Sequence, residues 1–236
     1  MDTQFTVVFA LYPRMTQLDF TGPLEVFARL PGAHCVLASR DGGTLEAAAS
    51  FALANVARLR DIGECALLCV PGGFGTVAAL EDREYLAQLR RLAASARYVT
   101  SVCTGSLLLA AAGLLVGRRA ACHWAWRDSL AAFGVVVDDA RVVRDGNVIT
   151  GGGVTAGIDM ALTVMAEIAG AAYAQSVQLA IEYAPMPPFC SGRPEQASPQ
   201  VVAAALKRLE PLRGERDAAV ARAAAALAGG LFQTSR

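Results

Sequence analysis

Histidine is scarce in this sequence, and its cysteines are not spaced for a zinc site. His34 and His123 are the only histidines, too few for most histidine-rich metal sites. No two cysteines form a C-x-x-C pair, which argues against a zinc site and against a disulfide framework. The cysteines are Cys35, Cys65, Cys69, Cys103, Cys122 and Cys190. We therefore expect free thiols, a reducing cytoplasmic location and no cofactor.

The chain also has no net charge to attract a highly charged partner. It carries 21 basic and 21 acidic residues, and no stretch of the sequence forms a basic stripe. This balance predicts no nucleic-acid partner and favours a small neutral substrate. Met1 to Gln4 lack a cationic segment, so we predict no secretory signal.

One uncharged stretch, residues 98–117, is long enough to suggest a membrane span. Its centre is polar, however, since it contains Thr100, Ser101, Thr104 and Ser106. A buried strand that turns into an apolar helix explains both the polar centre and the apolar ends. We therefore predict no membrane span.

The order of apolar segments predicts an α/β fold with a doubly wound, mostly parallel sheet. Strands are expected at 5–11, 35–38, 66–70 and 99–102, with shorter ones at 119–124 and 135–137. A further strand is expected at 45–51, and a hairpin with an Asp-Gly turn at 141–150. Helices are expected at 23–30, 84–96, 106–112, 126–133, 155–169, 171–183 and 201–227. We predict one α/β domain over residues 1–190. Residues 191–236 should form a loop and an Ala/Arg-rich helical extension that packs on this domain or on a partner subunit.

The segment around Cys103 is the centre of the interpretation. Buried strand 99–102 ends at this cysteine, and Gly105 then leads into a helix of leucine and alanine. Such a strand–turn–helix presents its central side chain in a crevice at the edge of the sheet, close to the N–H groups of the helix. A helix N-terminus stabilises negative charge, so we expect Cys103 to be a reactive thiolate nucleophile. The alternative is a buried structural cysteine.

A cysteine nucleophile needs a proton partner, and Asp19 is the better candidate. It follows the first strand in a predicted loop, between apolar Leu18 and Phe20, which should desolvate the carboxyl and raise its pKa. The alternative is a surface or helix-capping aspartate. His123, at the end of a predicted short strand, is a weaker candidate and is otherwise a hydrogen-bonded histidine at the pocket rim.

Ligands bind doubly wound sheets beyond the C-terminal ends of the strands. Loops 16–22, 71–75, 103–105 and 151–155 should meet there. The N–H groups of Gly73 and Thr104 are candidates for an oxyanion site, and Thr104 could hydrogen-bond the substrate or Asp19. The expected substrate-binding residues are Gly72, Gly73, Phe20, Phe74, His123, Trp124, Gly152 and Val154, although core packing is the simpler explanation for the apolar ones.

These segments resemble the ThiJ/PfpI-like superfamily over nearly the full length. The matching segments are residues 17–23, 71–73, 101–106, 123–124, 150–159 and 182–185. The resemblance implies a flavodoxin-like fold of the class I glutamine-amidotransferase type. It also implies a homodimer, no metal, Cys103 as nucleophile, Asp19 as acid/base and Thr104 beside them.

Within the superfamily, the chain is similar to the branch that hydrates isonitriles. Thr104 replaces the histidine that follows the cysteine in protease-like members, and Asp19 replaces the glutamate of many other relatives. Cys103 would attack the terminal isonitrile carbon. Asp19 would supply a proton, giving a thioimidate, and then activate water to release the formamide. The alternatives are a redox- or ligand-sensing protein of the same fold and a glyoxalase-like hydratase of 2-oxoaldehydes.

Overall fold

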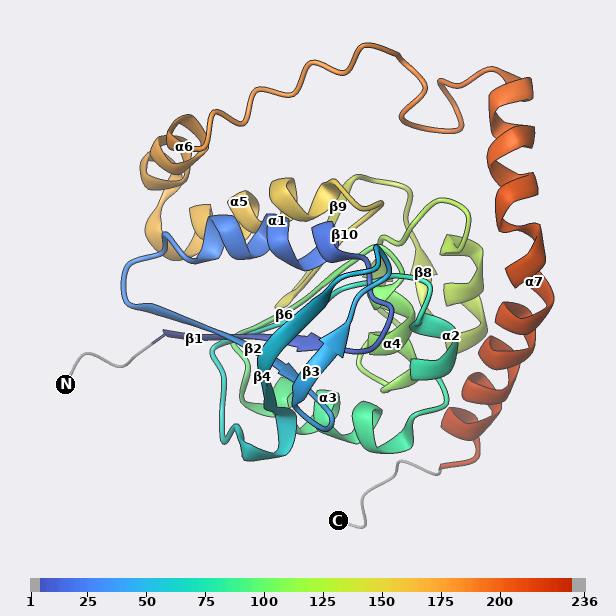
Figure 1. The fold of residues 1–236 in the computed structure, drawn as a ribbon, viewed down its shortest axis with the longest axis horizontal. Coiled ribbons are helices and arrows are strands. Elements are labelled where there is room, and N and C mark those ends of the chain that lie inside the picture. The colour runs from blue at the N-terminus through green and yellow to red at the C-terminus, as the bar shows by residue number, and fades with distance from the viewer. Residues whose placement is uncertain (1–4, 231–236) are drawn as a thin grey trace.

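The computed structural model describes residues 5–230, and its centre is an eight-stranded sheet (Figure 1). The strand order is β3-β4-β2-β1-β5-β6-β10-β9, and the pairings between neighbours are parallel except at β3–β4 and β10–β9. The strands are β1 (Phe5–Leu11), β2 (Ala33–Ser39), β3 (Gly43–Glu46), β4 (Ala52–Arg58), β5 (Leu67–Val70), β6 (Tyr98–Val102), β9 (Val142–Asp145) and β10 (Val148–Gly151).

Strands β1, β5, β6 and β10 are buried because helices cover both faces of the sheet. Every residue of β5, β6 and β10 is buried, and so are the last five residues of β1. A strand with two buried faces has no solvent side and therefore reads as a continuous apolar run. This explains why the sequence predicted β1 and β5 directly, since both are continuous apolar runs.

Helices form a layer on each side of the sheet (Figure 1). On one side α1 packs on α5, and α5 packs on α6; on the other, α4 contacts α2, α3 and α7. The helices are α1 (Gln17–Phe27), α2 (Thr76–Ala79), α3 (Arg83–Ser95), α4 (Gly105–Ala111), α5 (Ala156–Ala169), α6 (Ala171–Ala180) and α7 (Pro199–Ala228). A 3-10 helix η1 (Leu59–Asp61) follows β4.

A smaller unit lies between α4 and β9. Strands β7 (Arg119–Ala120) and β8 (Val136–Val137) pair in parallel, and the 3-10 helix η2 (Arg127–Phe133) connects them. Helix α7 packs against η2, α2 and α4. Residues 181–198, which join α6 to α7, run along the outside of the molecule without helix or strand (Figure 1).

The predicted α/β architecture is confirmed, with several local corrections. The first helix begins at Gln17, so Asp19 lies in its first turn and not in a loop. The expected strand 119–124 has only two residues, which leaves His123 in an irregular segment. The segment 45–51 is the end of β3 and the turn into β4, and the two-residue turn of the hairpin is Gly146-Asn147.

No helix within residues 5–230 is long and apolar enough to cross a membrane. This agrees with the strand–turn–helix interpretation of residues 98–117, which form β6, the Cys103 turn and α4.

Two helical glycines should respond in opposite ways to substitution by alanine. At Gly157 in α5, a Cβ would lie 2.9 Å from Pro23 Cγ and 3.1 Å from Val102 Cγ2, which are side chains of α1 and β6. At Gly214 in α7, a Cβ would meet nothing within 4 Å. We expect Gly157→Ala to lower the free energy of unfolding by about 1–3 kcal/mol, the usual range for overpacking.

Gly214→Ala, the matched control, should raise the free energy of unfolding by about 0.5–1 kcal/mol, because alanine has the higher helix propensity. Denaturant unfolding of both variants measures the two effects. A stabilised Gly157→Ala protein would show that α1 and α5 are not packed as closely as described.

Candidate active site

The candidate site lies at the C-terminal ends of four neighbouring strands of the sheet. Strands β1, β5, β6 and β10 lie side by side, and the segments that follow their C-terminal ends come together. Strands β2 to β4, which follow β1 in the chain, lie on one side of β1, and β5 lies on its other side. The winding of the sheet therefore reverses between β1 and β5. Ligand sites of open parallel sheets lie at such a reversal. The loops after β1 and β5 are joined directly, since Thr16 N donates to Gly72 O at 2.8 Å.

Cys103 lies on a sharp, strained turn between β6 and α4. Its φ is +58°, a left-handed value that is uncommon for a residue other than glycine. The peptide N–H of Cys103 donates to Gly152 O at 2.7 Å and to Gly151 O at 3.1 Å, which ties the turn to the end of β10. Gly105 permits the turn to pack on β5, because a Cβ there would lie 2.2 Å from Val70 O. The predicted strand–turn–helix is therefore confirmed.

Asp19 is fully buried in the first turn of α1, with an exposed fraction of 0%. Its Oδ2 accepts a hydrogen bond from Gly72 N at 2.8 Å, whereas its buried Oδ1 has no hydrogen-bond partner within residues 5–230. Burial raises the pKa of Asp19 from 3.8 to about 7, although the Gly72 N–H and the Cys103 side chain oppose the increase. The predicted desolvation of Asp19 is confirmed, and the carboxyl can gain or lose a proton near neutral pH.

Gly72 sets the distance between Asp19 and the Cys103 turn. A Cβ at this position would lie 2.5 Å from Thr104 N, 2.6 Å from Thr104 Oγ1 and 2.9 Å from Asp19 Oδ2. Only a residue without a side chain lets the β5 end, the α1 turn and the Cys103 turn approach this closely. Gly72, which we expect to bind substrate, also lets Asp19 approach the Cys103 turn closely.

The Cys103 thiol is more strongly buried than the sequence suggested. Its burial raises the pKa of the thiol well above the ordinary value, and the neighbouring Asp19 and Cys122 raise it further. The N–H and the hydroxyl of Thr104 act in the opposite direction. The expectation that the helix N-terminus leaves a resting thiolate is therefore wrong, because desolvation outweighs the seven-residue helix α4. A thiol with a raised pKa acts as a nucleophile only when a base removes its proton.

Three buried hydroxyl groups connect the Cys103 turn to the end of β1. Thr104 Oγ1 lies 2.7 Å from Thr76 Oγ1, Thr76 Oγ1 lies 2.9 Å from Tyr12 Oη, and Tyr12 Oη donates to Pro71 O at 3.0 Å. Gly73 N donates to Thr104 Oγ1 at 2.9 Å. Gly73 was expected to offer its N–H to an oxyanion, but in the structure this N–H is already bound to Thr104.

His123 lies beside the loop that follows β10. Its Cδ2 would be 3.5 Å from a Cβ on Gly153, and its ring faces that of Trp124 with centroids 5.7 Å apart. Its Nδ1 accepts from Ala125 N at 3.3 Å, so the neutral ring carries its proton on Nε2. Burial lowers the pKa of His123, and it does not share a hydrogen bond with Cys103 or Asp19 within residues 5–230. These positions favour the pocket-rim interpretation.

The remaining expected substrate-binding residues are not all brought together. Phe20 is buried in the core, whereas Phe74 is 46% exposed. Val154 is partly buried and packs on the core, and Gly152 anchors the Cys103 turn through its carbonyl oxygen. No group of three or more histidine, cysteine or acidic residues within 5–230 is arranged to hold a metal ion.

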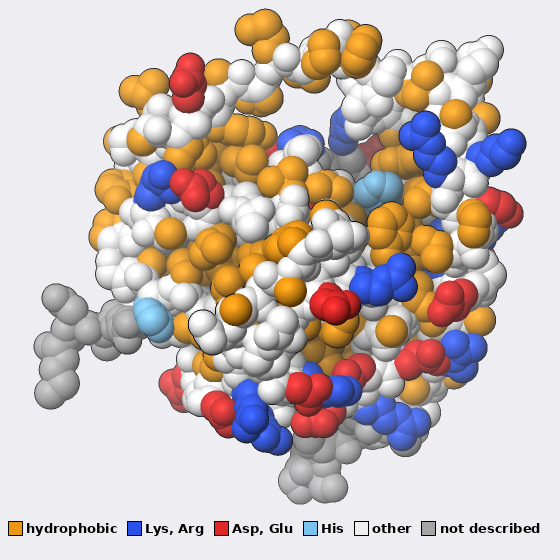
Figure 2. Space-filling model, viewed as in Figure 1, with side chains coloured by type: hydrophobic (Ala, Val, Ile, Leu, Met, Phe, Trp, Pro, Cys, Tyr) orange, Lys and Arg blue, Asp and Glu red, His pale blue; other side chains and the backbone are white. Residues whose placement is uncertain are grey.

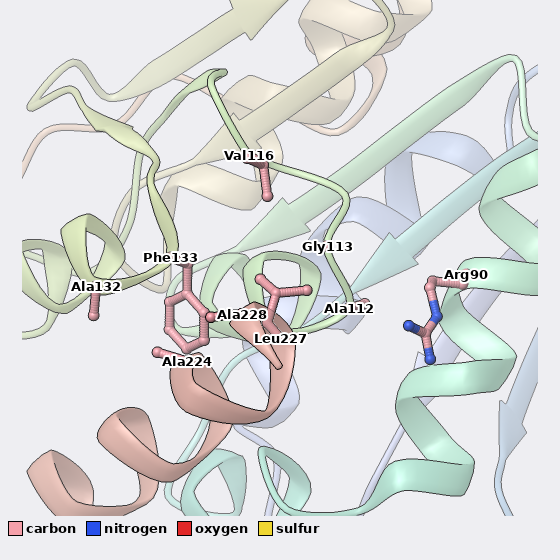
Figure 3. A pocket seen from close by; sticks show the side chains of 9 residues that line it. All are labelled: Arg90, Ala112, Gly113, Val116, Ala132, Phe133, Ala224, Leu227 and Ala228. Carbon is pink, nitrogen blue, oxygen red and sulfur yellow. The ribbon is translucent and has the colours of Figure 1, made fainter. Parts of the chain in front are cut away.

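A hollow of about 460 Å³ lies elsewhere, between α3, the end of α4, η2 and the end of α7 (Figure 3). Its lining residues are Arg90, Ala112, Gly113, Val116, Ala132, Phe133, Ala224, Leu227 and Ala228. None of them belongs to the site around Cys103, so this hollow is separate from the candidate active site.

Tyr12 and Thr76 were missed as site residues. Both follow strand ends, Tyr12 directly after β1 and Thr76 after the glycine-rich turn that ends β5. The same reasoning that selected Asp19 applied to them, but a tyrosine and a threonine at strand ends are common in cores. The hydrogen bonds that connect them to Thr104 appear only in the folded chain.

Asp19→Asn should remove part of the pH dependence of stability. Because burial raises the Asp19 pKa to about 7, the folded protein keeps this carboxyl protonated at pH values where the unfolded chain ionises it. The contribution of Asp19 to the free energy of unfolding is fully present below the ordinary pKa of 3.8. It is lost as the pH rises to about 7. The free energy of unfolding falls by roughly 4 kcal/mol over this range, because each pKa unit is equivalent to about 1.4 kcal/mol.

Denaturant unfolding of the wild type and of Asp19→Asn at acidic and mildly alkaline pH measures this pH-dependent loss of stability. The asparagine variant keeps an acceptor for the Gly72 N–H, so its stability advantage over the wild type should grow towards alkaline pH. Parallel stability curves for the two proteins would contradict the raised pKa.

Similarity to known proteins extends over most of the chain. The profile of the DJ-1/PfpI family matches residues 5–167. The chain is 48% identical over 219 residues to isonitrile hydratase from Pseudomonas putida, an alignment that covers 93% of this chain and 96% of that protein. It is 40% identical to a ThiJ/PfpI family protein from Pseudomonas syringae of known crystal structure, with a TM-score of 0.88 and coverage of 92% and 91%.

A third relative is the HTH-type transcriptional regulator CdhR from Pseudomonas aeruginosa. It is 30% identical over 171 residues, which are 69% of this chain and 50% of that protein. The resemblance seen in the sequence is thus confirmed over almost the whole length. In sequence and in fold, the chain belongs to the DJ-1/PfpI family.

Proposed function

We propose that this protein hydrates isonitriles to N-substituted formamides, with Cys103 as the nucleophile and Asp19 as the acid and base. Similarity to a curated isonitrile hydratase over nearly the full length supports a hydro-lyase activity. The observation that carries the mechanism is the state of Asp19. Its Oδ1 is buried without a hydrogen-bond partner in the described chain, and its pKa of about 7 lets it move a proton in either direction.

In the first half of the reaction, the Asp19 carboxylate takes the proton of the Cys103 thiol. The sulfur attacks the terminal carbon of R–N≡C and forms a carbon–sulfur bond. Asp19 then returns the proton to this carbon, which gives the thioimidate R–N=CH–S–Cys103. A buried thiol with a raised pKa needs such a base, and a carboxyl with a pKa near 7 can supply one.

In the second half, the Asp19 carboxylate takes a proton from water, whose oxygen adds to the thioimidate carbon. The nitrogen accepts a proton, the carbon–sulfur bond breaks and the sulfur regains its proton. The product is R–NH–CHO, so one isonitrile and one water are consumed. Every proton transfer in this scheme takes place close to the Cys103 sulfur. The single buried carboxyl of Asp19, which lies beside the sulfur, can therefore perform all of them.

Substitutions at the two central residues separate their roles. Cys103→Ala should abolish formamide formation because no covalent intermediate can form. Asp19→Asn should lower the rate of formamide formation about a hundredfold or more. The amide keeps the Gly72 hydrogen bond but cannot exchange a proton. Asp19→Glu should retain part of the activity, because the carboxyl is kept and only its reach changes. Ultraviolet monitoring of formamide formation from cyclohexyl isocyanide gives the rates.

His123→Ala is the control, and we expect it to retain most of the turnover. Near-wild-type activity of a folded Asp19→Asn protein together with an inactive His123→Ala protein would assign the proton transfer to the histidine. Methylglyoxal loss is measured in parallel. Turnover of methylglyoxal without turnover of the isonitrile would support the glyoxalase-like alternative and reject isonitrile hydration.

We also propose that the chain forms a homodimer. Apolar side chains gather over α1, α5 and α6 on the face drawn in Figure 2, where acidic and basic side chains are otherwise intermixed. Leu179 at the end of α6 is 81% exposed, and Met186 in the following segment is 91% exposed. Large apolar side chains grouped in this way on a soluble domain favour an interface between copies.

Sedimentation at micromolar concentration should give a species of twice the chain mass of 24.6 kDa. Leu179→Glu should shift the population towards the monomer because it places a charge within the proposed interface. Val136→Glu, at an exposed apolar position in β8, is the matched control and should remain dimeric. A monomeric wild-type protein would reject the dimer.

A further inference from the structure

The proposed mechanism gives no role to α7, which lies outside the part of the chain matched by the family profile, residues 5–167. One side chain of this helix reaches the segment before η2. Arg216 Nη1 donates to Ala125 O at 3.0 Å, and the guanidinium carbon lies 5.2 Å from the centre of the Trp126 ring. The same guanidinium pairs with Asp217. Because Trp126 is buried, the cation covers an aromatic face that is shielded from water, which strengthens the attraction.

Residues 123–126 form a tight turn, here called the 123–126 turn. Trp126 N donates to His123 O at 2.8 Å, which closes the turn, and Ala125 N donates to the His123 ring at 3.3 Å. The segment from β7 to η2 has neither helix nor strand, so no ladder of hydrogen bonds to neighbouring strands positions it. The position of the turn therefore depends on contacts at its two ends.

Both ends of this segment are anchored by side chains from other elements. At the inner end, Ser106 Oγ donates to Ala121 O at 2.6 Å, and Ala121 N donates to Thr150 Oγ1 at 2.8 Å. Ser106 and Thr150 are both fully buried. At the outer end, Arg216 supplies the contact from α7. Residues 122–124 lie between these two anchors.

The segment lies on the β10 side of the candidate nucleophile. Asp19 belongs to the β1 and β5 side of the Cys103 turn, whereas Gly152 follows β10 on the other side. A Cβ on Gly152 would lie 3.8 Å from Cys122 O, and Gly152 O accepts the Cys103 N–H at 2.7 Å. The chain therefore enters the 123–126 turn beside the loop that holds Cys103. Since Asp19 occupies the opposite side, this side is available to the organic group of a substrate.

We propose that Arg216 is a positioning residue that holds Trp124 as a wall of the pocket against the organic group of the isonitrile. The inference rests on the proposed function. Trp124 is half-buried, and its ring lies beside that of His123 with centroids 5.7 Å apart, so the two rings form one aromatic surface. Such a surface favours a cyclohexyl group over a methyl group, because the larger group buries more apolar area. Helix α7 then contributes to substrate selection through the 123–126 turn.

Arg216→Met removes the donor and the cation and keeps an unbranched apolar side chain. We expect the KM for cyclohexyl isocyanide to rise about tenfold, the usual effect of a lost apolar contact in a pocket. The kcat should stay within about twofold, because contacts with the organic group act equally on the substrate and the transition state. The KM for methyl isocyanide should be unchanged, since a methyl group buries little area against the wall.

Arg216→Lys keeps a cation and an N–H donor at the same position. Its KM for cyclohexyl isocyanide should stay within about threefold of the wild-type value, because lysine can still lie over the Trp126 ring and reach Ala125 O. Lysine and methionine variants with the same raised KM would contradict a role for the charge and the hydrogen bond.

Arg222→Met is the matched control. Arg222 lies on the same helix and pairs with Glu81, which lies between α2 and α3 and not in the 123–126 turn. This variant removes a comparable contact of α7 with the domain, so both KM values should be unchanged. The inference is overturned by an equal rise in Arg222→Met, by a rise of both KM values by the same factor in Arg216→Met, or by no rise at all.

Fluorescence tests the position of the turn without a substrate. Trp124 and Trp126 are the only tryptophans in the chain, so Trp126→Phe leaves Trp124 as the single emitter and keeps a ring beneath the guanidinium. In this background, Arg216→Met should increase the quenching of Trp124 by acrylamide, and Arg222→Met should not. Unchanged quenching in Arg216→Met would overturn the inference, because the turn would then keep its position without the arginine.

The two measurements separate this inference from the proposed function. A wild-type protein that hydrates neither isocyanide would reject the proposed function and with it the selection of isonitriles, even if Arg216 holds the turn by fluorescence. Hydration of both isocyanides by the wild type, with unchanged KM and unchanged quenching in Arg216→Met, would reject only the role of Arg216.

Discussion

The Asp19 carboxyl lies beside the Cys103 thiol without access to solvent, and one hydrogen bond from the Gly72 N–H holds it there. This arrangement depends on the contact of three strand ends at a residue that has no side chain. A Cβ on Gly72 would fall within 3 Å of both Asp19 and Thr104. Burial has the same consequence for both groups in the resting state: it raises the pKa of each, so each keeps its proton more readily and can pass it only to a nearby partner.

The burial that sets the proton affinity of Asp19 also affects the stability of the folded protein. A carboxyl that ionises near pH 7 in the folded state makes the native structure less stable at neutral pH than a neutral side chain would. The left-handed backbone of Cys103 adds a further cost of about 1–3 kcal/mol. The dense packing of the central strands, in which every residue of β5 and β6 is buried, maintains these unfavourable features. Unfavourable local structure of this kind is typical of functional sites.

Much of this fold could be predicted because its signals are local. Strands with two buried faces are continuous apolar runs, and Cys103 stands where such a run changes into a helix. Asp19 was identified from its apolar neighbours, although the start of α1 was placed too late because Pro23 looked like a first-turn proline and in fact lies inside the helix. The acidity of Cys103 could not be predicted, because the sequence indicates the helix N-terminus but not how completely the thiol is desolvated. The hydroxyl series of Tyr12, Thr76 and Thr104 could not be predicted either, since it joins residues 28 and 64 positions apart in the chain.

The central claim is that a single buried carboxyl beside Cys103 exchanges its proton near neutral pH. Carbon-13 NMR of the protein labelled at its aspartate carboxyl carbons measures this directly, with Asp19→Asn to assign the signal. We expect one resonance that titrates with a midpoint near the Asp19 pKa of about 7 and is absent from the variant. An Asp19 resonance that titrates near the ordinary value of 3.8 would contradict the account, because the carboxylate would then be too weak a base for a buried thiol.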